Sequence, residues 1–208
     1  MPIVRDAISF DLINPGTQLT ISHVNNGNLL VVGVGANNNN DIITGITYAG
    51  SAMTRAGVGI IAANNISAYM YYLLNPSTGT NNIVISSGSS VLFQGEGVSY
   101  TGARQTPQPD ASTGTTITSG TSAANTLTTV ADNSVHLAFY YVSASNPTSV
   151  TNGSILQSQF MAESSPLLVT PAASHVMTGN GGTQNWAVVG ASFAPPTGGF
   201  MNTISKKW

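Results

Sequence analysis

Charged side chains are scarce in this chain of 208 residues. Five basic and seven acidic residues make up 6% of the sequence and leave a net charge of −2, whereas about 25% is usual for a soluble domain. Between residues 56 and 103 the one charged side chain is Glu96, and between residues 133 and 205 it is Glu163. Nucleic-acid binding needs a basic surface, which Lys206 and Lys207 alone cannot provide. We therefore expect no nucleic-acid partner and no polybasic membrane targeting.

Cysteine and long apolar runs are also missing. Without cysteine, disulfide bonds and thiolate metal sites are excluded. No apolar run approaches the roughly 18 residues of a membrane helix, because Gly33 and Gly35 interrupt the longest one, so we expect no membrane partner. The first 16 residues contain Arg5 and Asp6 and do not match a signal peptide. Either the chain is assembled inside a cell or a leader has been removed.

Short runs with period-two alternation or β-branched residues dominate the chain. We expect strands at residues 17–24, 29–34, 42–48, 53–55, 66–74, 83–85, 91–100, 115–118, 127–130, 134–142, 155–160 and 186–193. Turn signals separate them at the spacing of sandwiches and barrels. No segment of 11 or more residues carries a capped helical stripe, although a helical turn near residues 122–125 or 171–175 stays open. The pattern predicts an all-β fold, an antiparallel β-sandwich of the jelly-roll or immunoglobulin-like type.

Neither composition nor length divides the chain into two domains. We expect one sandwich domain over residues 14–196, with an N-terminal arm at residues 1–13. Residues 102–114 contain Pro107 and Pro109 and indicate a loop or a sheet edge. Residues 195–199 read PPTGG and indicate a hinge, so residues 197–208 are expected to form a C-terminal hinge and arm.

Four segments resemble a known pattern: NLLVVGVGA (residues 28–36), ITGITYAGSAMTRAG (43–57), AYMYYLLNPSTGTNNIVIS (68–86) and VSYTGARQTPQPDAS (98–112). In this order they resemble a β-sandwich domain family that recurs in bacteriophage virion proteins and bacterial surface proteins. The chain departs from the family pattern at Ala49, where a glycine is usual. The resemblance implies the sandwich fold and a structural role in a virion, but no catalytic residue, because the shared motifs are strands, turns and loops.

No catalytic or metal-binding constellation emerges from the sequence. A G-x-S-x-G nucleophile elbow is absent, and His23, His136 and His175 are far apart without metal-ligand spacing, so we interpret them as surface or packed histidines. Glu96 and Glu163 could be paired carboxylates of a glycosidase, but we interpret Glu96, between two glycines, as an outward charge on a bulge. We expect no enzyme activity, no cofactor and no metal.

Two other residue groups suggest binding. Tyr69 and Tyr71, which alternate on one strand, could form a stacking face for a sugar, although alternating tyrosines are also ordinary strand residues. The tail after the hinge ends in Trp208, which could anchor in a neighbouring subunit. The subunit-contact candidates in this tail are Phe200, Ile204, Lys206, Lys207 and Trp208.

These observations together predict a bacteriophage virion structural protein, above all a capsid decoration or cement protein. Its expected partners are copies of itself, in a symmetric homo-oligomer for which a trimer is one form, and other virion proteins such as the major capsid protein or a head or tail component. Its expected location is the virion, after assembly in the host cytoplasm. The alternative is a carbohydrate-binding or adhesin module of a phage fibre or a bacterial surface.

Overall fold

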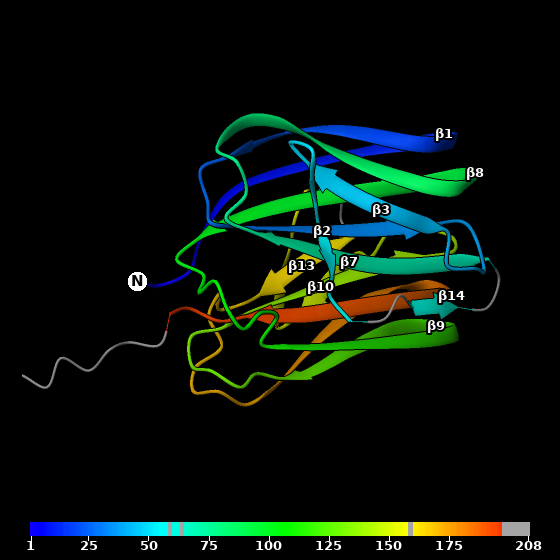
Figure 1. Ribbon diagram of the computed structural model, residues 1–208. Helices are drawn as coiled ribbons and strands as arrows, with labels where there is room; N and C mark the ends of the chain where they lie inside the picture. Colours follow the sequence, from blue (N-terminus) through cyan, green and yellow to red (C-terminus); the bar gives the residue numbers. More distant parts are fainter. Residues whose placement is uncertain (58–59, 63–64, 158–159, 197–208) are drawn as a thin grey trace, which may run out of the picture.

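The computed structural model describes residues 1–57, 60–62, 65–157 and 160–196. Over these residues the regular structure consists of strands, which form two antiparallel sheets packed face to face (Figure 1). The predicted all-β sandwich is therefore confirmed. Within the same residues, no helix is present that is long and apolar enough to cross a membrane.

The first sheet is formed by the N-terminal half of the chain. Its strands are β1 (Val4–Asn25), β2 (Leu29–Ala36), β3 (Ile43–Tyr48), β4 (Ser51–Ala52), β5 (Thr54–Arg55), β6 (Ile60–Ala62), β7 (Ile66–Leu74) and β8 (Gly79–Thr101). They pair in the order β4-β3-β8-β2-β7-β5, with β1 beside β8 and β6 beside β7. The turn between β7 and β8 uses Asn75 and Gly79 at positive φ values of 48° and 86°, a conformation that Asn and Gly adopt more readily than other residues.

The long strands β1 and β8 bend, so that the first sheet folds over itself. Their register shifts between Ile13 and Gln18. A Cβ atom on Gly97 would lie 2.5 Å from Cδ1 of Ile83 in the same strand, which shows how closely the two parts of β8 approach each other. A second hydrophobic core fills the fold, and it includes Leu19, Ile21, Leu30, Val32, Val34, Tyr48, Tyr69, Ile83, Ile85 and Phe93.

The second sheet is formed by the C-terminal half of the chain. Its strands are β9 (Ala111–Thr128), β10 (Val135–Val142), β11 (Ser149–Thr151), β12 (Gly153–Ile155), β13 (Met161–Ser164) and β14 (Ser174–Phe193). They pair in the order β11-β14-β10-β13-β12, with β9 beside β14. This sheet also folds over itself, because a Cβ atom on Gly179 of β14 would lie 2.7 Å from Cδ1 of Tyr140 of β10.

The two halves share one connectivity, and we refer to them as the first unit (β1–β8) and the second unit (β9–β14). In each unit the first strand pairs along the whole last strand, β1 with β8 and β9 with β14. The second strand, β2 or β10, pairs with the C-terminal part of that last strand. A short strand, β3 or β11, pairs with its N-terminal part. These paired strands of one unit therefore have counterparts in the other.

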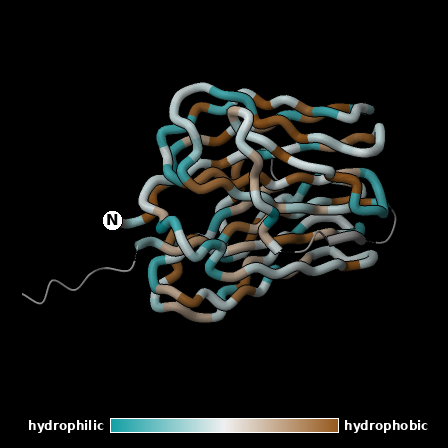
Figure 2. The backbone as a smooth tube through the Cα atoms, in the orientation of Figure 1, coloured by the Kyte–Doolittle hydropathy of each residue, from teal (hydrophilic) through white to brown (hydrophobic). Residues whose placement is uncertain are grey.

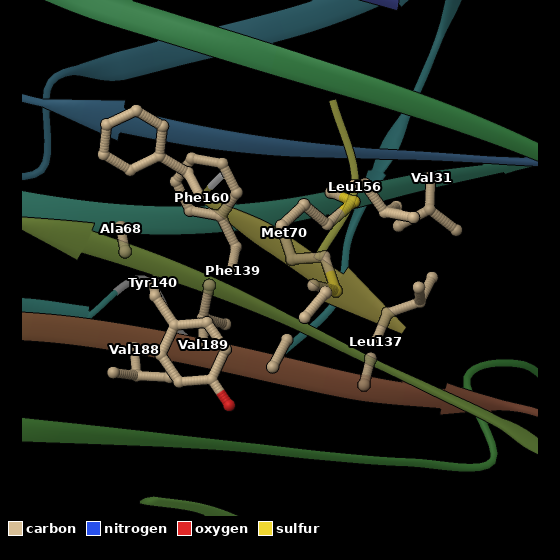
Figure 3. Close-up of a cluster of buried hydrophobic side chains, with 14 of the residues drawn as sticks. Val31, Ala68, Met70, Leu137, Phe139, Tyr140, Leu156, Phe160, Val188 and Val189 are labelled. Carbon is tan, nitrogen blue, oxygen red and sulfur yellow. The ribbon is translucent and has the colours of Figure 1, made fainter. Parts of the chain in front are cut away.

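The main core lies between the two sheets and contains the side chains drawn in Figure 3. Val31 and Met70 of the first sheet belong to this core together with Leu137 and Phe139 of the second sheet. Gly33 of β2 has to lack a side chain, because its Cβ would be 2.2 Å from Cδ2 of Phe139. The strand β2 is buried on both faces, as its unbroken apolar run predicts.

Several predicted boundaries are wrong. Residues 4–13, expected as a free arm, belong to β1 and pair with β8. Within the expected strand at 155–160, β12 ends at Ile155 and β13 begins only at Met161, while residues 158–159 lie outside the described residues. Residues 111–128 form one continuous strand, β9, although only residues 115–118 and 127–128 of it lay in the expected strands. The C-terminal residues 197–208 lie outside the described residues.

Candidate functional sites

The tyrosines proposed for sugar stacking are buried. Tyr69 has no exposed surface and Tyr71 is 5% exposed. The guanidinium of Arg55 lies 5.1 Å from the ring centre of Tyr69 and 5.3 Å from that of Tyr71, and its Nε donates to the Tyr71 hydroxyl at 3.0 Å. These ring faces are closed to a ligand, so the proposed stacking surface of Tyr69 and Tyr71 is wrong.

Arg55 also fixes the asparagine-rich loop that precedes β3. Its two terminal nitrogens donate to the carboxylate of Asp41 at 2.7 and 2.9 Å, and this guanidinium lowers the pKa of Asp41. The hydroxyl of Tyr69 donates to the carbonyl of Asn40 at 3.1 Å. The carboxylate of this loop is therefore committed to a structural ion pair, and we assign the cluster to loop anchoring.

Both glutamates considered for glycosidase chemistry are buried between the sheets. Glu96 has no exposed surface, so its interpretation as an outward charge is wrong. Its Oε2 accepts a hydrogen bond from the backbone nitrogen of Met161 at 3.2 Å. Glu163 accepts one from the Tyr100 hydroxyl at 2.8 Å and pairs with Arg5. Burial raises the pKa of Glu163 and holds that of Tyr100 well above its usual value. These contacts join β1 and β8 to β13 across the sandwich.

The histidines are not all separate, as their positions in the sequence suggested. His136 and His175 lie together, with their Nδ1 atoms 3.0 Å apart, and Nε2 of His136 is 2.8 Å from Oδ1 of Asn125. With the carboxamide oxygen as acceptor, Nε2 of His136 carries the hydrogen, and its Nδ1 accepts from His175. Burial, then the neighbouring His175, lowers the pKa of His136 to about 3. Burial also lowers the pKa of His175.

His23 lies in the first unit, where its Nδ1 is 2.9 Å from Oγ of Ser9. Burial lowers its pKa to about 4. Among the described residues, no group of three or more His, Cys, Asp or Glu side chains is arranged to hold a metal ion. The three histidines therefore form one pair and one separate residue.

Comparison of the two units shows how unusual the histidine pair is. Leu30 lies opposite Ser99 in the first unit as His136 lies opposite Ser192 in the second. Leu30 belongs to the second core of the first unit, so an aliphatic side chain stands in the first unit where the second unit has His136.

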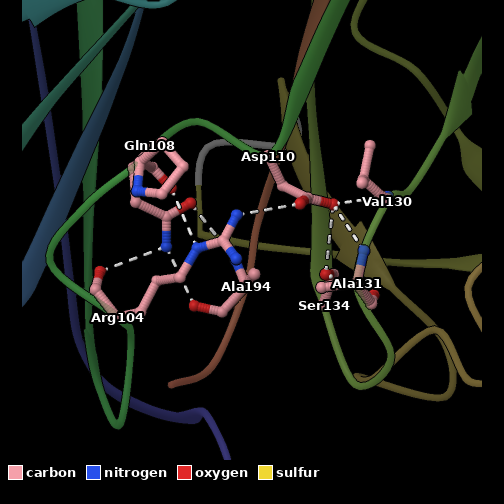
Figure 4. Close-up of polar contacts among 8 residues, drawn as sticks. Arg104, Gln108, Asp110, Val130, Ala131, Ser134 and Ala194 are labelled. Atoms are coloured by element: carbon pink, nitrogen blue, oxygen red, sulfur yellow. Dashed lines mark hydrogen bonds and ion pairs between the residues drawn. The ribbon is translucent and has the colours of Figure 1, made fainter. Parts of the chain in front are cut away.

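The segment between the units is held by a dense polar network (Figure 4). Arg104 pairs with Asp110, whose side chain is 1% exposed. The other oxygen of this carboxylate accepts hydrogen bonds from the backbone nitrogens of Val130 and Ala131. Gln108 donates to the carbonyl of Ala194 at 2.9 Å. The proline-containing loop expected at residues 102–114 is therefore a connecting segment at residues 102–110. Its ion pair and hydrogen bonds hold it in place, so its polar groups are used within the chain.

Two long strands form free sheet edges. β1 pairs with β8 and β9 pairs with β14, and no other described strand pairs with either of them. In Figure 1, β1 lies at the top of the molecule and β9 at the bottom. On the outer edge of each strand no described strand supplies hydrogen-bond partners, although β6 lies against β9.

Comparison of the chain with protein-family models, with curated proteins and with solved structures found no match. The candidate contact residues Phe200, Ile204, Lys206, Lys207 and Trp208 lie outside the described residues.

Proposed function

We propose that the protein is a structural subunit of a bacteriophage virion, most specifically a capsid decoration or cement protein. Its work is adhesion: it binds copies of itself and other virion proteins, such as the major capsid protein or a head or tail component. The observation that carries this proposal is β9, an 18-residue edge strand without a charged residue or a proline. The resemblance of residues 28–112 to a domain family that recurs in bacteriophage virion proteins supports a virion as the particle to which it belongs.

The neutral surface suits dense packing of many copies. Like charges repel, and this repulsion grows with the number of identical subunits brought together. A chain with 6% charged residues largely avoids that cost. Its three arginines are also used within the fold, since Arg5, Arg55 and Arg104 each form an ion pair. The outer surface therefore offers hydroxyl, amide and backbone groups to its neighbours.

Electron microscopy of virus particles tests the proposal. Particles from lysates that contain the protein are purified by density gradient and labelled with gold-conjugated antibodies against it. We expect the label on intact particles, with the chain sedimenting at a fixed ratio to the major capsid protein. A protein that stays in the soluble fraction while labelled particles are absent contradicts a virion role.

The C-terminal tail is the second contact in the proposal. Deletion of residues 200–208 removes Phe200, Ile204, Lys206, Lys207 and Trp208, and we expect weaker co-sedimentation with particles. The matched control replaces Lys206 and Lys207 by serine and keeps the apolar residues. If the deleted chain sediments as the full chain does, the tail is not a contact.

A further inference from the structure

We propose that the free edge of β9 is a self-association surface, on which β9 of a second copy pairs antiparallel about a two-fold axis. The purpose of this contact rests on the proposed structural role, whereas the contact itself rests on the sheet edge. Two copies joined in this way continue the second sheet from one molecule into the next.

The backbone groups on an exposed strand edge lack hydrogen-bond partners within the protein, and a second strand can supply them. The outward N–H and C=O groups of the edge are hydrogen-bonded to water, and an added strand replaces those bonds with a regular ladder. Natural proteins that stay monomeric interrupt such edges with charges, prolines, bulges or short strands. The two edges of this sandwich differ in charge and proline, although they occupy corresponding positions in the two units.

The edge of β1 is protected in several ways. The strand carries Arg5, Asp6 and Asp11 and contains Pro15, which has no N–H to donate. Its pairing with β8 shifts register in three places. A partner strand could not follow this edge without placing unpaired backbone groups or buried charges against it.

The edge of β9 has neither charge nor proline along its whole length. Its pairing with β14 shifts register in two places near Ser119, so the regular edges are the segments on either side of that point. The strand consists largely of threonine, serine, glycine and alanine, and threonine favours strands. Most of β9 is pale in Figure 2, which corresponds to intermediate hydropathy. Side chains such as Thr116, Thr118 and Thr126 are exposed, so small hydroxyl groups flank the edge instead of repelling charges.

These differences select the second copy of the chain as the partner. A neutral strand offers no charge that would recognise a charged peptide, but it is compatible with itself, because threonine pairs across an antiparallel ladder are favourable. Pairing of β9 with β1 of a neighbour would be head-to-tail and open-ended, and the protected edge of β1 prevents it. Pairing of β9 with β9 is isologous and closes after two copies. A trimer would need a different contact.

Light scattering coupled to gel filtration tests the inference on the full chain. We expect the wild-type protein to elute at twice the 21.3 kDa mass of one chain. Thr126→Lys together with Thr116→Lys places positive charges along the edge, and we expect this variant to elute as a monomer. Thr20→Lys is the control on the other edge strand, because Thr20 lies in β1 and is also exposed. We expect this control to remain dimeric, and circular dichroism verifies that each variant is folded.

Single cysteines locate the axis, since the chain contains no natural cysteine. Cysteine is placed in turn at Thr116, Thr118, Ser122 and Thr126, and the proteins are oxidised. If the two copies are related by a two-fold axis, the yield of disulfide-linked dimer should be highest for cysteines near the axis. It should fall for cysteines farther from the axis. Thr20→Cys serves as the control and should stay uncrosslinked.

A wild-type monomer at high concentration, or equal loss of the dimer with Thr20→Lys, overturns the inference. Open polymers instead of dimers overturn it as well, because they indicate a head-to-tail contact. A monomer that is nevertheless found on particles leaves the proposed function standing. A dimer formed through β9, with the protein absent from particles, supports the self-association surface and contradicts the proposed function.

Discussion

The Asn125–His136–His175 cluster can be replaced as a whole by aliphatic residues, because Leu30, the counterpart of His136 in the first unit, is aliphatic. The triple variant is Asn125→Leu, His136→Leu and His175→Ile. We expect the second unit to accept this aliphatic set. The single variant His136→Leu, by contrast, should not be tolerated well.

The magnitudes follow from burial. His136 and Asn125 have no exposed surface, so His136→Leu leaves the carboxamide oxygen of Asn125 buried without its partner. An orphaned buried polar group costs about 1–3 kcal/mol, and we expect the single variant to lose about that much stability. The triple variant leaves no orphan in the cluster. Replacing a buried polar network by apolar residues of similar volume is often neutral or stabilising, here by about 1–3 kcal/mol.

Urea denaturation at pH 7, followed by tryptophan fluorescence and circular dichroism, measures both changes. For a chain of this size 1 kcal/mol corresponds to about 2–4 °C in melting temperature, so calorimetry is a second readout. We expect the triple variant to unfold at or above the wild-type midpoint and His136→Leu below it. A triple variant that is destabilised as much as the single one would show that the loss of stability does not come from the orphaned carboxamide of Asn125.

Three further predictions concern other parts of the fold. Stability should fall as the pH drops from about 6.5 to about 4, because His23, with a pKa of about 4, and His136, with one of about 3, are neutral in the native state and take up protons on unfolding. The free energy of unfolding should change by at most about 1.4 kcal/mol per pH unit for each histidine. Urea midpoints that stay constant across this range would contradict the prediction. Gly33→Ala should lower the free energy of unfolding by about 1–3 kcal/mol through the clash with Phe139. Gly45→Ala is the control, because its Cβ has no neighbour within 4 Å, and it should leave the melting temperature nearly unchanged. Equal effects of the two variants would refute the close packing at Gly33. Arg5→Ala should lower the free energy of unfolding by about 1–2 kcal/mol. This is less than the loss of a partner in a fully buried ion pair, because the Arg5 side chain is 41% exposed. A double-mutant cycle with Glu163→Gln measures the coupling energy between Arg5 and Glu163, and additive effects would show that the pair contributes nothing.

Local alternation predicts most strands of the inner layers. The apolar run of β2 and the alternating residues of β7 and β10 are visible from the sequence because their own side chains report burial. The N-terminal strand escapes such analysis. Residues 4–13 contain Arg5, Asp6 and Asp11 among apolar residues, and the strand exists because β8 offers it an edge about 90 residues further along the chain.

The polar clusters depend even more on distant pairing. His136 and His175 are 39 residues apart, and only the register of β9, β10 and β14 brings them and Asn125 together. One signal in the sequence does point to the cluster, namely a histidine within the otherwise apolar alternation of residues 135–142. Glu96 was misjudged because its flanking glycines suggest an exposed bulge, whereas they are small so that another part of β8 can pack against them.

The pairing of first with last strands in each unit has a consequence for how the chain folds. Val4 pairs with Thr101, and Ala111 pairs with Ser192, so each unit closes a loop of about 80 to 100 residues before its longest ladder can form. Such high contact order makes folding slow, since the entropy of loop closure is lost before the contacts are gained. During synthesis β1 has to wait until β8 has emerged from the ribosome. The polar, charge-bearing sequence of β1 keeps this waiting strand in water, whereas a purely apolar first strand would aggregate there.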